Sequence, residues 1–314
     1  MDKISRSSII KGSAAALAFG PRIAQAQTLE TLRLAGVPTD DMTPVFYAIK
    51  TGMYAKAGID LQFVPTSSGG AATTAVIAGA YDIAKTSPLA PVLAHVRGIP
   101  VQLIANGIIA TPRTPFSAML VASDSPIKTG ADCNGKTGVS PGLSDINSLA
   151  MMTWIDRNGG DSRTLKWVEV PGSAAAEAIA ERRVDFALLQ EPQLGSALAT
   201  GKVRSLADAY AAVSERFITS SYVVQEDFAS KHADALRRFV RTTYAAAAYT
   251  NPRKAETVAL MAEVTKIAPA VYAKMTRGDG ATTSDPALLQ PIIDMAVHYK
   301  VLTRPLAAKE MYRG

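Results

Sequence analysis

The chain has 314 residues, enough for one large domain or two of ordinary size, and 48% of them are hydrophobic. Its formal net charge is +6, but no basic cluster is interleaved with aromatic residues, so nucleic acid is not an expected partner. The sequence has no metal-ligand spacing, no Gly-x-Ser-x-Gly elbow and no P-loop. Composition and motifs therefore argue against an enzyme, and we expect no cofactor.

The first 26 residues have the features of a secretory signal peptide. A basic stretch at 2–11 precedes an apolar run at 13–19, and Ala24-Gln25-Ala26 is a small-x-small cleavage site. We expect cleavage after Ala26. Residues 5–11 resemble a twin-arginine motif in which serine replaces the second arginine, so Sec and twin-arginine export both stay open. No other apolar segment reaches about 18 residues, so no membrane span is expected.

Strands and helices alternate in the first part of the predicted fold. Strand-like runs at 32–37 and 58–63 flank a helix that follows Thr43-Pro44. Residues 63–88 then read as strand, Gly-containing loop, helix, strand and loop, which is the pattern of a βαβ unit. Glycines before a helix leave backbone N–H groups open to a negative group, although an ordinary βα turn explains them equally well. A further helix at 91–97 and a strand at 101–105 follow.

Two segments are candidate crossovers between lobes. Residues 111–115 contain two prolines and cannot form regular structure, and residues 216–219 precede the last strand, at 221–224. Between the crossovers the strand–loop–helix plan repeats, with strands at 118–122, 136–139, 167–170 and 184–189. From residue 233 onward the pattern is helical. The only cysteine, Cys133, cannot form an internal disulfide; we expect it to fill an apolar slot, with a reactive thiol as the alternative.

Short segments along most of the chain carry a resemblance to a known family. They are GMY at 52–54, GIDL at 58–61, SGG at 68–70, IAGAYDIA at 77–84, GIP at 98–100, GKT at 135–137, VDFA at 184–187 and EP at 191–192. In this order the chain resembles the periplasmic substrate-binding proteins of ABC importers, in the group of sulfonate, taurine, nitrate and thiamine-precursor pyrimidine binders. Each segment is also explained by the fold, so the resemblance concerns architecture more than ligand.

The resemblance implies an α/β, two-lobed type II periplasmic binding protein. Each lobe would be a mixed sheet flanked by helices, and two crossover segments would join the lobes. Lobe 1 would comprise residues 28–113 and 220–314, and lobe 2 residues 114–219. The implied protein is a periplasmic monomer that closes on a small organic ligand and delivers it to an ABC permease in the inner membrane.

The resemblance also places a ligand between the lobes. The implied ligand-binding residues are Thr39, Asp40, Asp41, Met42, Ser68, Gly69, Ser87, Pro88, Leu143, Ser144, Asp145, Glu191 and Tyr222. For Asp145 a solvated helix-start residue is the alternative, and for Glu191 a hinge contact is.

Acidic residues outnumber basic ones in this predicted site, where only Lys85 and Arg113 carry positive charge. A doubly charged anion is therefore disfavoured, and a zwitterion, a monocarboxylate or sulfonate, or a heterocycle fits better. Two other functions stay open. One is an exported ligand-sensing adaptor for a receptor, and the other is an enzyme similar to the pyrimidine-precursor synthases.

Overall fold

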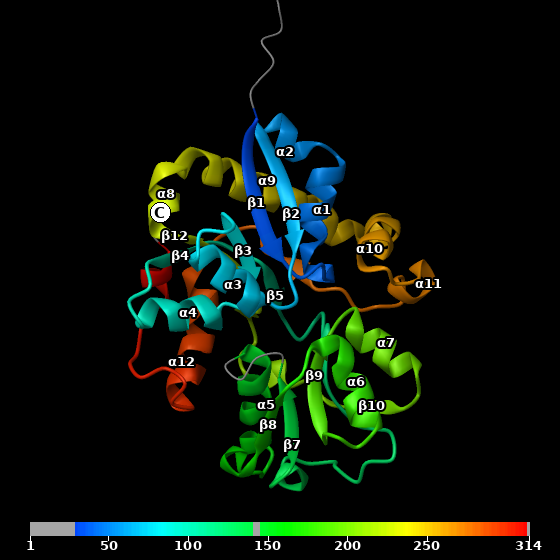
Figure 1. The fold of residues 1–314 in the computed structure, drawn as a ribbon. Helices are drawn as coiled ribbons and strands as arrows, with labels where there is room; N and C mark the ends of the chain where they lie inside the picture. Colours follow the sequence, from blue (N-terminus) through cyan, green and yellow to red (C-terminus); the bar gives the residue numbers. More distant parts are fainter. Residues whose placement is uncertain (1–28, 141–144, 313–314) are drawn as a thin grey trace, which may run out of the picture.

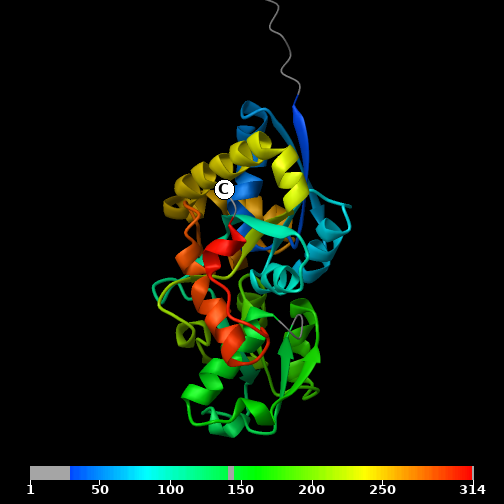
Figure 2. The ribbon, with the colours of Figure 1, turned by 90° about the vertical axis from the view of Figure 1, so that its left-hand side faces the viewer.

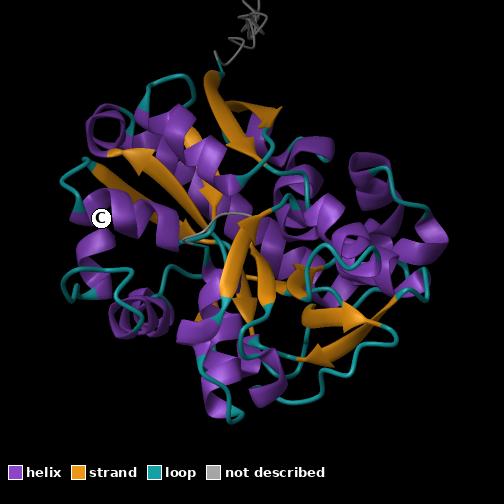
Figure 3. Ribbon diagram, turned by 60° about the horizontal axis from the view of Figure 1, so that its bottom comes forward, coloured by secondary structure: helices purple, strands orange, loops and turns teal. Residues whose placement is uncertain are grey.

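The computed structural model describes residues 29–140 and 145–312 (Figure 1). The described residues form two five-stranded sheets, one in each lobe, and a three-stranded sheet between them. Figure 3 shows helices packed around the strands of both lobes. The predicted α/β architecture with two lobes is confirmed, and the predicted signal peptide lies outside the described residues.

The sheet of lobe 1 has the strand order β2-β1-β3-β12-β4. Its strands are β1 (Glu30–Gly36), β2 (Ile59–Pro65), β3 (Ile83–Thr86), β4 (Val101–Asn106) and β12 (Ser221–Gln225). The first three are mutually parallel, and β12 returns antiparallel between β3 and β4. The helices of this part of the chain are α1 (Thr43–Lys50), α2 (Met53–Lys56), α3 (Gly69–Ile77), α4 (Leu89–Val96), α8 (Glu226–Lys231), α9 (Ala233–Thr250), α10 (Val258–Thr265), α11 (Pro269–Tyr272) and α12 (Gln290–His298).

The sheet of lobe 2 has the strand order β10-β6-β9-β7-β8. Its strands are β6 (Ser117–Ala122), β7 (Thr137–Ser140), β8 (Lys166–Glu169), β9 (Phe186–Gln190) and β10 (Val203–Ala207). Its helices are α5 (Ile146–Arg157), α6 (Gly172–Ala180) and α7 (Gln193–Ala199). Because β7 is parallel to both β8 and β9, the loops that follow these strands meet at one edge of the sheet.

The two crossovers pair with each other. Strand β5 (Ile108–Ala110) lies in the outgoing segment and β11 (Phe217–Ile218) in the returning one. A third strand, β13 (Asp279–Gly280), adds to β5 from the C-terminal part of the chain, which the sequence pattern did not indicate. Short 3₁₀ helices complete the described structure at η1 (Asp40–Met42), η2 (Ala131–Cys133), η3 (Ser162–Thr164), η4 (Tyr210–Ala212), η5 (Asn251–Thr257), η6 (Pro286–Leu288) and η7 (Ala308–Met311).

The C-terminal helix α12 touches both lobes. It packs against α4 of lobe 1 and α5 of lobe 2, and Figure 2 shows it running down from the upper lobe beside the lower one. One apolar core passes through all three helices and includes Leu89, Leu149 and Ile292, each at most 1% exposed. The predicted lobe boundaries stay a prediction, but this packing ties the end of the chain to lobe 2 as well as to lobe 1.

Candidate functional site

A cleft of about 390 Å³ opens between the two lobes. Most of its lining is small and polar. Lobe 1 contributes Val37, Thr39, Asp41, Ser67, Ser68, Gly69, Lys85, Thr86 and Ser87, the returning crossover Thr219 and Ser220, and lobe 2 Asp145, Ile146, Asn147, Glu169, Pro171, Gly172, Ser173, Leu188, Leu189, Gln190 and Gln193. This volume and these short hydroxyl and amide side chains suit a small polar solute.

The N-terminus of helix α3 forms one wall of the cleft. The hydroxyl of Ser68 accepts a hydrogen bond from Ala71 N–H at 3.1 Å and so caps the helix. Gly69 follows because its backbone lies against Thr86, where a Cβ atom would come within 2.7 Å of Thr86 Oγ1. The first N–H groups of a helix have no partner within the helix, so this wall favours negative groups.

Helices α5 and α6 bring their N-termini to the cleft from lobe 2. Pro171 precedes α6, and Gly172 and Ser173 open it at the cleft. Helix α5 differs because its own cap is acidic: Asp145 Oδ1 accepts from Asn147 N–H at 2.9 Å. The charge of Asp145 thereby occupies the positive end of α5, while the starts of α3 and α6 carry no such acid.

The one basic residue in the described lining of the cleft, Lys85, is already paired. Its ammonium contacts the carboxylate of Asp41, and the residue is 7% exposed. Burial lowers the pKa of Lys85 to about 7, with the charge of Asp40 acting in the opposite direction. The direct contact with Asp41 favours the charged ammonium further, so the pair contributes little net charge to the cleft.

Asp145 is the carboxylate of the cleft that most needs a partner. Burial raises its pKa from 3.8 to about 6, while Asn147 N–H and the nearby Ser87 hydroxyl lower it. No basic side chain of the described residues contributes to this balance. At neutral pH the carboxylate is therefore ionised in a site that supplies hydrogen-bond donors but no cation.

A hydrogen-bonded group of side chains fixes the floor of the cleft in lobe 2. Tyr210 donates to Asn147 Oδ1 at 2.6 Å, and Gln190 Nε2 donates to Tyr210 Oη at 2.6 Å. Asn147 and Gln190 line the cleft, and sequence reasoning missed both. Gln190 directly follows the strand predicted at 184–189, so its place at a strand end was the available signal.

The predicted site residues divide into three sets. Lining the cleft are Thr39, Asp41, Ser68, Gly69, Ser87 and Asp145. Away from its lining are Asp40, Met42, Pro88, Glu191 and Tyr222. Leu143 and Ser144 lie outside the described residues.

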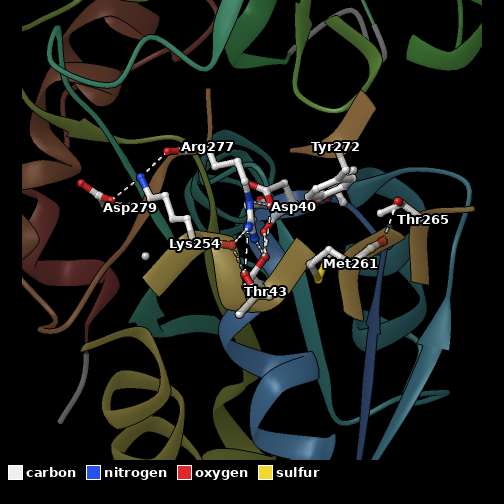
Figure 4. A network of polar contacts seen from close by, with 12 residues as sticks. Asp40, Thr43, Lys254, Met261, Thr265, Tyr272, Arg277 and Asp279 are labelled. Atoms are coloured by element: carbon white, nitrogen blue, oxygen red, sulfur yellow. Dashed lines mark hydrogen bonds and ion pairs between the residues drawn. The ribbon is translucent and has the colours of Figure 1, made fainter. Parts of the chain in front are cut away.

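Asp40 is held in a buried network rather than in the cleft (Figure 4). Its Oδ1 accepts hydrogen bonds from Arg277 Nε and Tyr272 Oη, both at 2.7 Å. Arg277 also donates to Thr43 Oγ1 at 2.8 Å, and its guanidinium is as buried as Asp40, each residue being 6% exposed. In a 3₁₀ helix neighbouring side chains point about 120° apart, so Asp41 faces the cleft while Asp40 turns inward.

The other four predicted site residues that lie away from the cleft have structural surroundings that explain their positions. Met42 and Tyr222 are buried in the lobe 1 core, where the Tyr222 ring lies 5.5 Å from that of Phe239. Pro88 precedes the first residue of α4. Glu191 lines a second cavity of about 650 Å³, and its Oε2 accepts from Gly195 N–H at 2.8 Å.

The described residues favour neither a reactive thiol at Cys133, which the sequence left open, nor a metal site, which it did not indicate. Burial raises the pKa of the Cys133 thiol to about 12, which makes a reactive thiolate unfavourable at neutral pH. The residues described contain no cluster of His, Cys, Asp or Glu able to hold a metal ion. Across the same residues, every helix is too short or too polar to cross a membrane.

The fold and the interlobe cleft define a type II periplasmic-binding-protein architecture. A family model described as NMT1/THI5 like matches residues 39–255, more than half of the chain. The chain therefore belongs to the NMT1/THI5-like family.

Comparisons with named proteins and with solved structures are consistent with this family. An aliphatic sulfonates-binding protein of Escherichia coli K12 is 27% identical over 233 residues, 72% of this chain and 69% of the relative. Among solved structures, the alkanesulfonate-binding protein SsuA of Xanthomonas axonopodis bound to MOPS has a TM-score of 0.74 at 17% identity, covering 90% of this chain and 98% of that one. A ligand-binding component of an ABC-type import system from Staphylococcus aureus has a TM-score of 0.78 at 16% identity, covering 90% and 96%. All three relatives are named for binding, and none is named for catalysis.

Proposed function

We propose that this protein captures a small organic solute in the periplasm and delivers it to an ABC permease. The observation that supports this most is the cleft, whose lining comes from both lobes and the crossover. Such a cleft couples binding to closure, because a solute that contacts both walls favours the arrangement in which the walls are close. The sulfonate-binding and import-system relatives support the same function.

The chemistry of the walls favours a zwitterionic solute. An anionic group suits the starts of α3 and α6. Beside the start of α3, Thr86 Oγ1 is buried without a hydrogen-bond partner among the described residues. A cationic group suits Asp145, which has no basic neighbour of its own in the described structure. Since Asp41 already neutralises Lys85, a second negative charge on the solute would meet no free cation in the described lining.

Export and assembly follow as part of the same proposal. The basic and apolar segments before Ala26 support cleavage there and release into the periplasm. One chain supplies both walls of the cleft, so a monomer suffices for binding, with the inner-membrane permease as partner.

A thermal-shift screen on protein that starts at Gln27 tests the function. We would compare amino sulfonates, amino carboxylates, alkyl sulfonates, monocarboxylates and pyrimidines. The expected result is a rise in melting temperature with amino sulfonates or amino carboxylates, with binding at one solute per chain and no turnover. Product formation from any of these compounds, or no stabilisation by any class, would refute the proposal.

A further inference from the structure

Glu191 joins the lobes at a place the solute does not touch. It follows β9 of lobe 2, is 9% exposed, and has its carboxylate turned away from the cleft that its neighbour Gln190 lines. The carboxylate accepts a hydrogen bond from the backbone N–H of Gly195, in lobe 2, at 2.8 Å. Burial raises the pKa of Glu191, and the nearby backbone N–H of Thr276, in the C-terminal part of the chain, acts in the opposite direction. The carboxylate thus lies where α7 meets the segment that follows α11.

The packing around this contact is close at Gly195. A Cβ there would lie 2.9 Å from Glu191 Oε2 and 3.3 Å from Met275 Cγ. Helices α7 and α11 are in contact, and both line the second cavity, next to which Glu191 lies. The surfaces of α7 and α11 are therefore in contact near Glu191, and the second cavity lies between them beside this contact.

The lobe 1 side of this contact is firmly fixed. Thr276 directly precedes Arg277, whose buried side chain donates to Asp40 and Thr43 (Figure 4). Arg277 also donates to Thr257. Asp40 in turn belongs to η1, whose next residue, Asp41, lines the cleft. The hydrogen-bond network of Arg277 and Asp40 therefore fixes the backbone next to Thr276 as well as the part of the cleft wall that contains Asp41.

We propose that Glu191 is a closing latch, which holds lobe 2 against the Met275–Thr276 segment of lobe 1 and so stabilises the arrangement that encloses the solute. The inference rests on the proposed function, since a latch has meaning only for lobes that open and close. A charged acceptor binds N–H donors more strongly than a neutral one does, and water can replace the hydrogen bonds that it loses when the lobes part. Glu191 is therefore a positioning residue rather than a ligand contact.

The test measures lobe separation without any solute. Spin labels at Lys56→Cys and Lys202→Cys, both exposed and one in each lobe, report interlobe distances, while buried Cys133 stays unlabelled. Glu191→Ala should lower the ratio of close to distant lobes about tenfold, since the N–H groups at this contact lose their charged acceptor. Glu191→Gln keeps a carbonyl acceptor but loses the charge, so its ratio should lie between those of wild type and Glu191→Ala. Glu181→Gln, which alters an exposed acid of the same lobe, is the matched control.

Hydrogen exchange supplies a second, local measurement. The amide of Thr276 should exchange about tenfold faster in Glu191→Ala and at an intermediate rate in Glu191→Gln. Identical distance distributions for wild type and Glu191→Ala, or equal effects of the Ala and Gln variants, would overturn the latch. Neither measurement needs a solute, so a failed solute screen would refute the proposed function without deciding the latch.

Discussion

The two lobes meet on opposite sides of the molecule, through contacts of different chemistry (Figure 1). On one side α12 packs between α4 and α5 in a continuous apolar core, which we call the apolar seam. On the other side α7 meets α11 beside Glu191 and Thr276, which we call the polar seam. Parting the apolar seam would expose core residues to water. Parting the polar seam would release the Glu191 carboxylate to water, together with apolar side chains such as Leu194 and Met275. If the lobes open as we propose, we expect them to pivot about the apolar seam and separate at the polar seam.

We expect the largest loss of stability from a substitution in the buried Arg277–Asp40 network, which supports the polar seam. Arg277→Met removes the partner of Asp40 and leaves a buried carboxylate, which costs about 3–5 kcal/mol of unfolding free energy. Urea denaturation measures this loss. Arg237→Met, which changes an exposed arginine of α9, is the control and should stay within about 0.5 kcal/mol. A loss below about 1 kcal/mol for Arg277→Met would mean that the network does not hold η1.

The apolar seam should be nearly as costly to disturb. Ile292→Ala removes a fully buried side chain from the core that joins the lobes, for a loss of about 2–5 kcal/mol. Asp294→Ala, on the exposed face of the same helix, should change stability by about 0.5 kcal/mol. If α12 is a pivot for both lobes, amides of α4 and α5 should lose exchange protection together. Loss confined to α4 would assign the helix to lobe 1 alone.

Neither seam includes the carboxylate that we assign to the solute. Asp145→Asn keeps a capping side chain but removes the charge, so binding of an amino sulfonate should weaken at least about tenfold. Calorimetric titration measures the affinity, with Glu177→Gln on lobe 2 as control. Equal affinity in wild type and Asp145→Asn would remove Asp145 from the cation site.

The pKa of Asp145 gives the same site a pH signature. Burial raises it from 3.8 to about 6, so the folded protein holds this proton more tightly than the unfolded chain does. Ligand-free stability should therefore fall as pH rises through this interval, and Asp145→Asn should remove that part of the dependence. Solute affinity should show the opposite trend and weaken as pH falls below about 6.

The smallest effect should come from a hydrogen bond at the edge of the apolar seam. Tyr299 donates to Asp156 Oδ2 of α5 at 2.8 Å, and Tyr299→Phe should cost about 0.5–1.5 kcal/mol in urea denaturation. The distances between labelled lobes should stay unchanged, because the apolar packing remains. A shift of those distances as large as that of Glu191→Ala would erase the distinction between the seams.

The sequence predicted the architecture better than the direction of individual side chains. Alternating apolar runs and Gly-containing loops indicated the βαβ units, because local pattern specifies strands and helices. Pattern could not tell that Asp41 faces the cleft while Asp40 turns toward Arg277, since that partner lies more than two hundred residues away in the chain. The same limit applies to Tyr222, which the family resemblance placed at the ligand but whose ring packs on Phe239.

Lobe 2 illustrates a second limit. Gln190 and Asn147 meet through Tyr210, and no local spacing connects these three residues. Glu191, next to Gln190, points to the opposite side of the strand end, because successive side chains in an extended chain alternate. A hinge contact was one of the two interpretations of Glu191 open from sequence, and our latch proposal depends on the nearness of Thr276, which no local pattern connects to Glu191.

A crystal structure with the most stabilising compound of the thermal-shift screen tests the central claim most directly. The account predicts the anionic group of the solute at the starts of α3 and α6, near Gly69 and Gly172, with its cationic group beside Asp145. The solute should contact both lobes, and the Glu191–Thr276 contact should be present. A compound bound to one lobe alone, or in the second cavity beside α7 and α11, would contradict it.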